Sequence, residues 1–350
     1  MSEIIFTSVT PIFNFEIQPP TGEFLHSGSF GGAKYSVVLK RFREGEPGFE
    51  KLWSYVEQSP NTLGRLISRT SDSSITKWTA AFLSDFLHVT DYFLVVETTQ
   101  SLDSPEALAE ERNNLAGASK ESHSVSGAVL DALRLHSSRG LQWYQTCLFR
   151  SPLHQAYPRS ESAITPPVNP LSISYLGAGR ANFVDSDFES ARSTINSLLR
   201  RKDATSTFDR VLSLASAYYR ISFNLESCDH AFLILMVVFE TLFKSEKERS
   251  SVAAARISKM LADSKKTAED IENSFTQGDS SFTKLRNKIA HGDPTLDSLK
   301  VLAKYPELHR YVTKAMIRLL AVPDGTLDAT KDYYEEIERV IRTRFDALPE

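Results

Sequence analysis

The chain has 350 residues, an apolar fraction of 41% and a net charge of −4 at pH 7. This length is typical of two domains. The slightly acidic balance argues against a protein that coats nucleic acid through overall positive charge, although it is compatible with a local basic groove.

The sequence also indicates a compartment. Its 2 cysteines, Cys147 and Cys228, are too few for a disulfide framework and have no metal-binding spacing, so we expect a reducing cytoplasm and no metal. The N-terminus lacks a signal-peptide pattern. The longest apolar run, residues 231–239, is too short to cross a bilayer, so we expect no contact with a membrane.

The first half of the chain mixes strand and helix patterns. β-Branched and aromatic residues predict strands at 4–6, 12–17, 35–39 and 143–149, and Gly31-Gly32 predicts a turn. Residues 92–98 fit either a buried strand or a continued helix. Apolar spacing of three and four residues predicts helices within 48–90 and at 129–135, and a capped, charged helix at 104–114. The polar residues 119–126 predict a loop.

A proline-rich segment separates the two halves. Residues 150–174 carry five prolines, which predicts an extended connection: Pro152, Pro158, Pro166, Pro167 and Pro170. We therefore expect a mixed α/β domain at 1–175 and an all-α bundle at 176–350. The fold class predicted for the whole chain is α+β.

The second half reads as a series of helices. The residue 229–243 helix is apolar on every side, which predicts the centre of a bundle. Ser186-Asp187 predicts the cap of an earlier helix, and Pro306 predicts the first turn of a later one. The predicted helices cover residues 186–199, 208–224, 229–243, 252–261, 267–275, 282–291, 306–320 and 332–348.

The sequence Arg286-Asn287-Lys288-Ile289-Ala290-His291 brings phosphate-binding and proton-transferring side chains close together. Asn287 and His291 are four residues apart and so share a helix face. Gly292 and Pro294 predict that the helix stops just after His291. The guanidinium matches phosphate oxygens in a fork geometry, and histidine titrates near neutral pH. These groups suit attack of an RNA 2′-hydroxyl on the adjacent phosphate.

The spacing by itself is also compatible with an ordinary helix end that carries a solvated arginine and a histidine cap. The surrounding helices add a second signal. The motif resembles the R-x4-6-H motif of the HEPN superfamily, in which Asn, Asp or His often follows the arginine. The apolar helix at 229–243, with Glu240 near its end, and the next helix, with Arg256, are similar to the Apea-like HEPN branch. The resemblance covers roughly residues 185–348.

This resemblance implies a helical bundle that dimerises and brings two motifs to one cleft. Many HEPN proteins are metal-independent endoribonucleases in toxin–antitoxin systems, abortive infection and CRISPR-linked defence. By the same resemblance, Arg286 holds the scissile phosphate, His291 transfers the proton, and Asn287 orients one of them or the RNA. No cofactor is implied.

Four neighbouring residues complete the predicted site. Glu240, at the end of an apolar helix, needs a partner and could hold Arg286 or Arg256 in place, or form a purely structural salt bridge. Arg256 either contacts RNA or pairs with Glu240. Lys284 and Lys288 flank the motif, where they either contact backbone phosphate or are simply solvated.

Three hypotheses about function follow. The first is a homodimeric HEPN endoribonuclease of bacterial stress response or phage defence, with an N-terminal domain that senses a trigger or partner. The second is a catalytically inactive HEPN-like module that dimerises or binds RNA, nucleotides or a partner protein. The third places the function in the N-terminal domain, with the bundle as a dimeriser.

Overall fold

The computed structural model describes residues 2–13, 15–19, 22–41, 92–102, 115–137, 141–143, 147–151, 181–202, 206–223, 225, 227–323, 326 and 332–349. The helices predicted within 48–90 and at 104–114 lie outside these residues, as do nearly all of the proline-rich segment and the boundary predicted near residue 175. The chain forms two compact units, which divide after Ile195, within helix α7 (Asp185–Lys202). The expected α+β class is confirmed.

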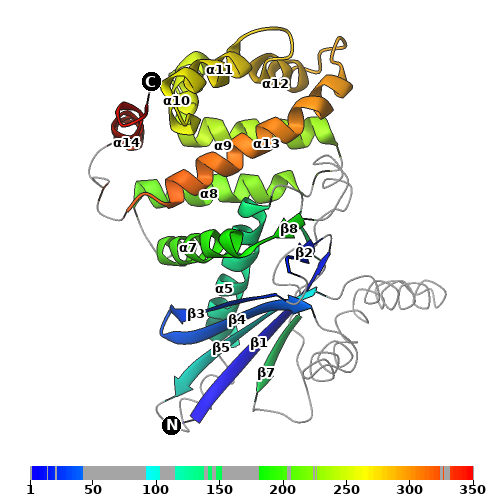
Figure 1. Cartoon of the computed structure of the whole chain (residues 1–350), viewed down its shortest axis with the longest axis vertical. Coiled ribbons are helices and arrows are strands. Elements are labelled where there is room, and N and C mark those ends of the chain that lie inside the picture. The colour runs from blue at the N-terminus through cyan, green and yellow to red at the C-terminus, as the bar shows by residue number, and fades with distance from the viewer. Residues whose placement is uncertain are drawn as a thin grey trace, which may run out of the picture. The chain divides into compact units, whose positions relative to one another are not determined.

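The first unit is built on an antiparallel sheet. Its strands are β1 (Ser2–Phe13), β3 (Glu23–Phe30), β4 (Ala33–Arg41), β5 (Tyr92–Leu102), β6 (Gln142–Trp143) and β7 (Cys147–Ser151). They lie in the order β3-β4-β5-β1-β6, and β7 also pairs with β1 (Figure 1). The ambiguous segment 92–98 is therefore strand. The Gly31-Gly32 turn is confirmed, with φ angles of 59° and 85° that glycine adopts easily.

Helix α5 (Leu115–His136) packs against β1 and β5. The loop predicted at residues 119–126 is wrong, because these residues belong to this helix. Serine, histidine and valine have lower helix propensity than alanine or leucine, but tertiary contacts override this preference. Ser122, Ser124 and Ser126 are buried, and the Ser126 hydroxyl lies 2.6 Å from that of Ser8 on β1. The small side chains allow the helix to pack closely on the sheet.

A short parallel pair, β2 (Phe15–Ile17) and β8 (Ala181–Phe183), leads into α7. The Phe183 ring packs against Phe15 at 5.1 Å and against Phe188 of α7 at 5.5 Å. Helix α7 begins at Asp185, so Asp187 is its third residue rather than the residue before it, and its carboxylate accepts a hydrogen bond from the Val184 backbone N–H at 3.0 Å, as in one half of a capping box.

The second unit is a helical bundle, as predicted. Its helices are α8 (Thr207–Ser222), α9 (Cys228–Phe243), α10 (Ser250–Leu261), α11 (Lys265–Thr276), α12 (Phe282–Ala290), α13 (Ser298–Leu320) and α14 (Tyr333–Asp346). Helix α9 contacts α8, α10, α12 and α13, which confirms that it is the central helix (Figure 1).

The position of Pro306 corrects one predicted helix start. Helix α13 begins eight residues earlier, at Ser298, and Asp297 caps it by accepting a 3.1 Å hydrogen bond from the Leu299 backbone N–H. Pro306 is therefore inside the helix and exposed. The proline removes one backbone donor, and its exposed position places this defect on the surface of the bundle, where helix carbonyls can be hydrated.

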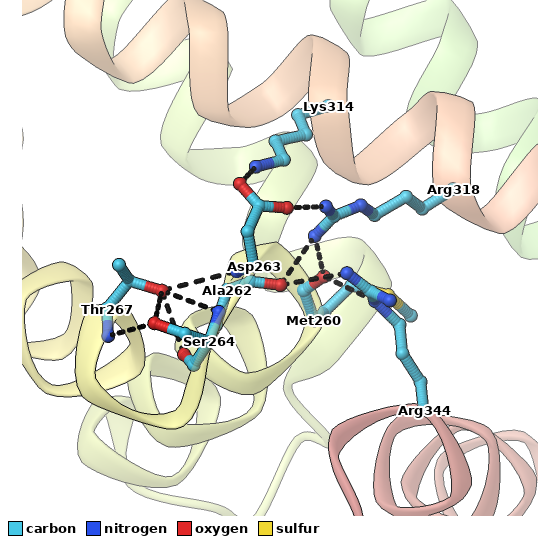
Figure 2. Close-up of polar contacts among 8 residues, drawn as sticks. All are labelled: Met260, Ala262, Asp263, Ser264, Thr267, Lys314, Arg318 and Arg344. Carbon is cyan, nitrogen blue, oxygen red and sulfur yellow. Dashed lines mark hydrogen bonds and ion pairs between the residues drawn. The ribbon is translucent and has the colours of Figure 1, made fainter. Parts of the chain in front are cut away.

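A polar junction fixes the end of α10 against α13 and α14 (Figure 2). Arg318 of α13 and Arg344 of α14 both donate to the carbonyl oxygens of Met260, in the last turn of α10, and of Ala262, directly after the helix. Asp263 accepts from Lys314 at 2.6 Å and also from Arg318. Helix carbonyls without an intrahelical partner need such donors. The junction therefore orients α10, whose opposite end lies near the predicted site.

Candidate functional site

Helix α12 carries the Arg286–His291 motif on the side away from the core. Phe282 and Leu285 are buried, and the Phe282 ring packs against Phe275 at 4.9 Å. The helix ends at His291, whose backbone N–H donates to the Asn287 carbonyl at 3.0 Å, and Gly292 follows with a φ of 61°. The predicted helix end is therefore confirmed, and Asn287 and His291 lie on one side of it.

Two neighbours hold the Arg286 guanidinium. Its Nη2 donates to Glu240 Oε2 at 3.1 Å, and its Nη1 donates to Asn287 Oδ1 at 3.2 Å. The Arg286 and Glu240 side chains are 28% and 25% exposed, so the pair is partly open to solvent. Of the two partners considered for Glu240, Arg286 is the one found. The contact with Asn287 draws the guanidinium toward the side of α12 that carries His291.

The His291 side chain is exposed and makes no hydrogen bond or ion pair with any described residue. Its backbone is fixed as the helix cap, whereas its imidazole is available to solvent or to a ligand. An imidazole in this position could accept or donate a proton. It is not buried inside the bundle, which is the placement that would have argued against a site.

Lysines surround the exposed side of α12. Lys284 donates to Asp279 at 3.1 Å, and Lys288 donates to the Thr295 hydroxyl at 3.1 Å. The hydrogen bond from Lys284, with smaller contributions from Lys288 and Lys300, lowers the pKa of the Asp279 carboxyl. Three ammonium groups therefore act on the Asp279 carboxyl. The contacts of Lys284 and Lys288 are exposed and weak enough for phosphate to replace.

Arg256 has a different environment from the one proposed for it. Its side chain is only 10% exposed and makes a bidentate contact with Glu248, at 2.6 and 2.8 Å. It also donates to Glu338 of α14 at 2.9 Å and to the Phe243 carbonyl at 3.1 Å. The pairing with Glu240 does not occur. Because its charge is matched by protein groups, we do not include Arg256 in the proposed RNA surface.

The Glu248–Arg256 pair makes stability depend on pH. The hydrogen bond from Arg256 is the main cause that lowers the pKa of Glu248 to about 2. A carboxyl whose pKa is lowered by folding contributes stability above its unfolded pKa of about 4.3 and loses that contribution as the pH falls toward 2. We expect Glu248→Gln to lower the free energy of unfolding by about 2 kcal/mol at pH 7, and by progressively less below pH 5.

Urea unfolding followed by circular dichroism at several pH values between 3 and 7 measures this difference. Glu246→Gln is the matched control, because Glu246 is exposed in the same loop and forms no hydrogen bond or ion pair among the described residues. Equal losses for Glu248→Gln at pH 7 and pH 3 would contradict the assignment of this stability to the ionised carboxylate.

The described residues offer little support for a cysteine nucleophile, a metal site or a membrane-spanning helix. Burial, followed by the charge of Asp229, raises the pKa of the Cys228 thiol to about 12, so it is not a thiolate nucleophile at neutral pH. The described ranges contain no group of three or more metal-binding side chains. In the same ranges, no helix combines the length and the apolar character needed to span a membrane.

Three residues near Arg286 were not predicted from the sequence. Lys244, Ser250 and Thr283 line a pocket together with Arg286 and Glu240. Thr283 belongs to the motif helix, but Lys244 and Ser250 come from the end of α9 and the start of α10. Their position depends on how α10 packs, which no local pattern indicates.

Comparisons of the chain with protein-family models, with curated proteins and with solved structures found no significant match. Function must therefore be inferred from the site itself.

Proposed function

We propose that the helical unit is a metal-independent endoribonuclease of the HEPN type. The observation that carries this proposal is the arrangement around α12: a guanidinium held by Glu240 and Asn287, and an exposed imidazole at the end of the same helix. In this arrangement Arg286 is fixed but still reachable by a phosphate, and the His291 side chain has no competing partner among the residues that the structure describes.

Each group has a role in the proposed reaction. The RNA 2′-oxygen attacks the adjacent phosphorus, and the bond from phosphorus to the 5′-oxygen of the next nucleotide breaks. The proton lost by the 2′-hydroxyl and the proton gained by the leaving 5′-oxygen require acid–base groups, a role that we assign to His291. Arg286 stabilises the charge on the phosphate oxygens, while Asn287 orients the guanidinium. Lys284 and Lys288 bind flanking phosphates.

We further propose a homodimer that joins two such sites in one cleft, acting in the cytoplasm in bacterial stress response or phage defence. The N-terminal unit would then respond to a trigger or a partner protein. These elements rest on the resemblance to HEPN proteins.

Incubating the purified protein with total tRNA and mRNA, with and without EDTA, tests the proposal. We expect cleavage that persists in EDTA and leaves 2′,3′-cyclic phosphate and 5′-hydroxyl ends, identified by end-specific labelling and mass spectrometry. Strict dependence on a divalent metal, or ends with a 5′-phosphate, would show that the proposed reaction is wrong.

One observation favours a second candidate, a HEPN-like module that binds but does not cleave. From residue 201 onward the chain has 23 basic and 23 acidic residues, so this half carries no net positive charge that would attract RNA. A protein that binds RNA or a partner tightly, and leaves every tested RNA intact, would support this candidate over the enzyme.

A further inference from the structure

A small pocket lies beside the Glu240–Arg286 pair, among α9, α10, α11 and α12. Six buried apolar residues form its floor: Met236, Phe239, Ala253, Ala254, Ile257 and Phe275. The other lining residues are partly exposed and so form its rim: Glu240, Lys244, Ser250, Thr283 and Arg286.

The rim contains more hydrogen-bond donors than the protein uses. Lys244, Ser250 and Thr283 have no side-chain hydrogen bond or ion pair among the described residues. The Nε of Arg286 is buried and also lacks a partner within the described part of the chain. A buried donor without a partner is unfavourable, so a ligand oxygen that accepts its hydrogen bond would be stabilised there.

The charge of the pocket favours an anion. Glu240 supplies the rim's carboxylate, and Arg286 already neutralises it at 3.1 Å. The ammonium of Lys244 remains unmatched by any residue that the structure describes. Helix α10 begins at Ser250 with no side chain capping its N-terminus, where the positive end of the helix dipole lies. The rim therefore offers unmatched positive charge together with hydroxyl donors.

The size of the pocket restricts the ligand. Its free volume is about 20 Å³, which is enough for one water molecule or for single oxygen atoms. A nucleobase could not enter it, whereas the oxygens of a phosphate group could enter while the rest of the ligand remains outside.

We infer that this pocket binds a phosphate group through Lys244, Ser250, Thr283 and Arg286. Building on the proposed function, that phosphate is the one next to the scissile phosphate on the same RNA strand, so that Arg286 lies between two phosphates. A free inorganic phosphate offers the same chemistry, and the experiment separates these two sources.

Binding to the full-length protein tests the inference directly. Inorganic pyrophosphate is titrated by calorimetry at constant ionic strength, into the wild type and into Lys244→Gln, Ser250→Ala and Thr283→Val. Lys266→Gln is the matched control, because Lys266 is an exposed lysine of α11 that does not line the pocket. We expect Lys244→Gln to weaken binding about tenfold, with smaller losses for the two hydroxyl variants, and Lys266→Gln to change it less than twofold.

A second arm identifies the source of the phosphate. An oligoribonucleotide with a 2′-O-methyl group at every position has no free 2′-hydroxyl and cannot be cleaved by this mechanism, and its binding is followed by fluorescence anisotropy. Loss of RNA affinity in Lys244→Gln, and competition by pyrophosphate in the wild type, identify an RNA phosphate. Pyrophosphate binding that depends on Lys244 but leaves RNA binding unchanged identifies free phosphate.

These results are separable from the proposed cleavage. If RNA is never cleaved but pyrophosphate binding depends on Lys244, the phosphate-binding assignment of the pocket is supported and the proposed ribonuclease activity is wrong. If RNA is cleaved and the three pocket variants bind pyrophosphate and RNA as the wild type does, the pocket assignment is wrong, whereas the proposed enzyme activity is supported. Failure of the wild type to bind pyrophosphate also overturns the assignment.

Discussion

His291→Ala should lower the rate of RNA cleavage by about 100- to 10,000-fold, the range expected for loss of a general acid–base group. The histidine side chain is exposed and has no hydrogen bond or ion pair among the described residues. Its loss should therefore leave the fold intact, with a change in the free energy of unfolding of less than about 0.5 kcal/mol. Initial cleavage rates and thermal unfolding of the same preparations measure both effects.

The control for this variant is His230→Ala. His230 is an exposed histidine of α9 in the same unit, and it does not belong to the proposed site. The His230→Ala variant should cleave RNA at the wild-type rate. If His291→Ala retained full activity, or if both alanine variants lost activity equally, His291 would have no role as the acid–base group.

The local part of the site could be predicted from the sequence, because it depends on helix periodicity. The positions of Asn287 and His291 follow from 3.6 residues per turn, and Gly292 marks the helix end where its positive φ is needed. The apolar run of α9 likewise predicts a central helix. These features require no knowledge of how distant segments pack.

The ion-pair partners of Arg286 and Arg256 could not be predicted from the sequence. Glu240 had two candidate partners, Arg286 and Arg256, and only the packing of α9 against α12 selects Arg286. Arg256 instead pairs with Glu248 and Glu338, the second of which is 82 residues away. Ion pairs between distant helices depend on the tertiary arrangement, and the sequence pattern contains no information about it.

The two wrong element predictions share a physical cause. Local propensity opposed a helix at residues 119–126 and inside α13 at Pro306, and in both places longer-range structure prevailed. In α5, buried serines contact the sheet. In α13, the core residues Val301 and Tyr305 before the proline, and Leu308 after it, are all fully buried and hold one continuous helix. Burial of this kind outweighs the cost of one missing backbone hydrogen bond.

Substitutions of Arg286 distinguish a catalytic role from a structural ion pair. Arg286→Lys keeps the positive charge but loses the planar guanidinium. The guanidinium binds Glu240 and Asn287 and still has N–H donors left for a phosphate. If Arg286 stabilises charge that develops on the phosphate, Arg286→Lys and Arg286→Ala should both lower the cleavage rate by about 100- to 1,000-fold. The loss of a partly exposed pair should cost about 1 kcal/mol of unfolding free energy or less.

The double variant Arg286→Ala/Glu240→Gln completes this test. Arg286→Ala leaves the Glu240 carboxylate without its partner, and the added Glu240→Gln change removes that charge, so the stability lost in the single variant should be largely recovered. Cleavage should not recover, because the phosphate-binding guanidinium is still absent. Recovery of both stability and cleavage in the double variant would mean that Arg286 acts only by balancing Glu240, and the phosphate would then have to be held by another group, such as Lys284 or Lys288.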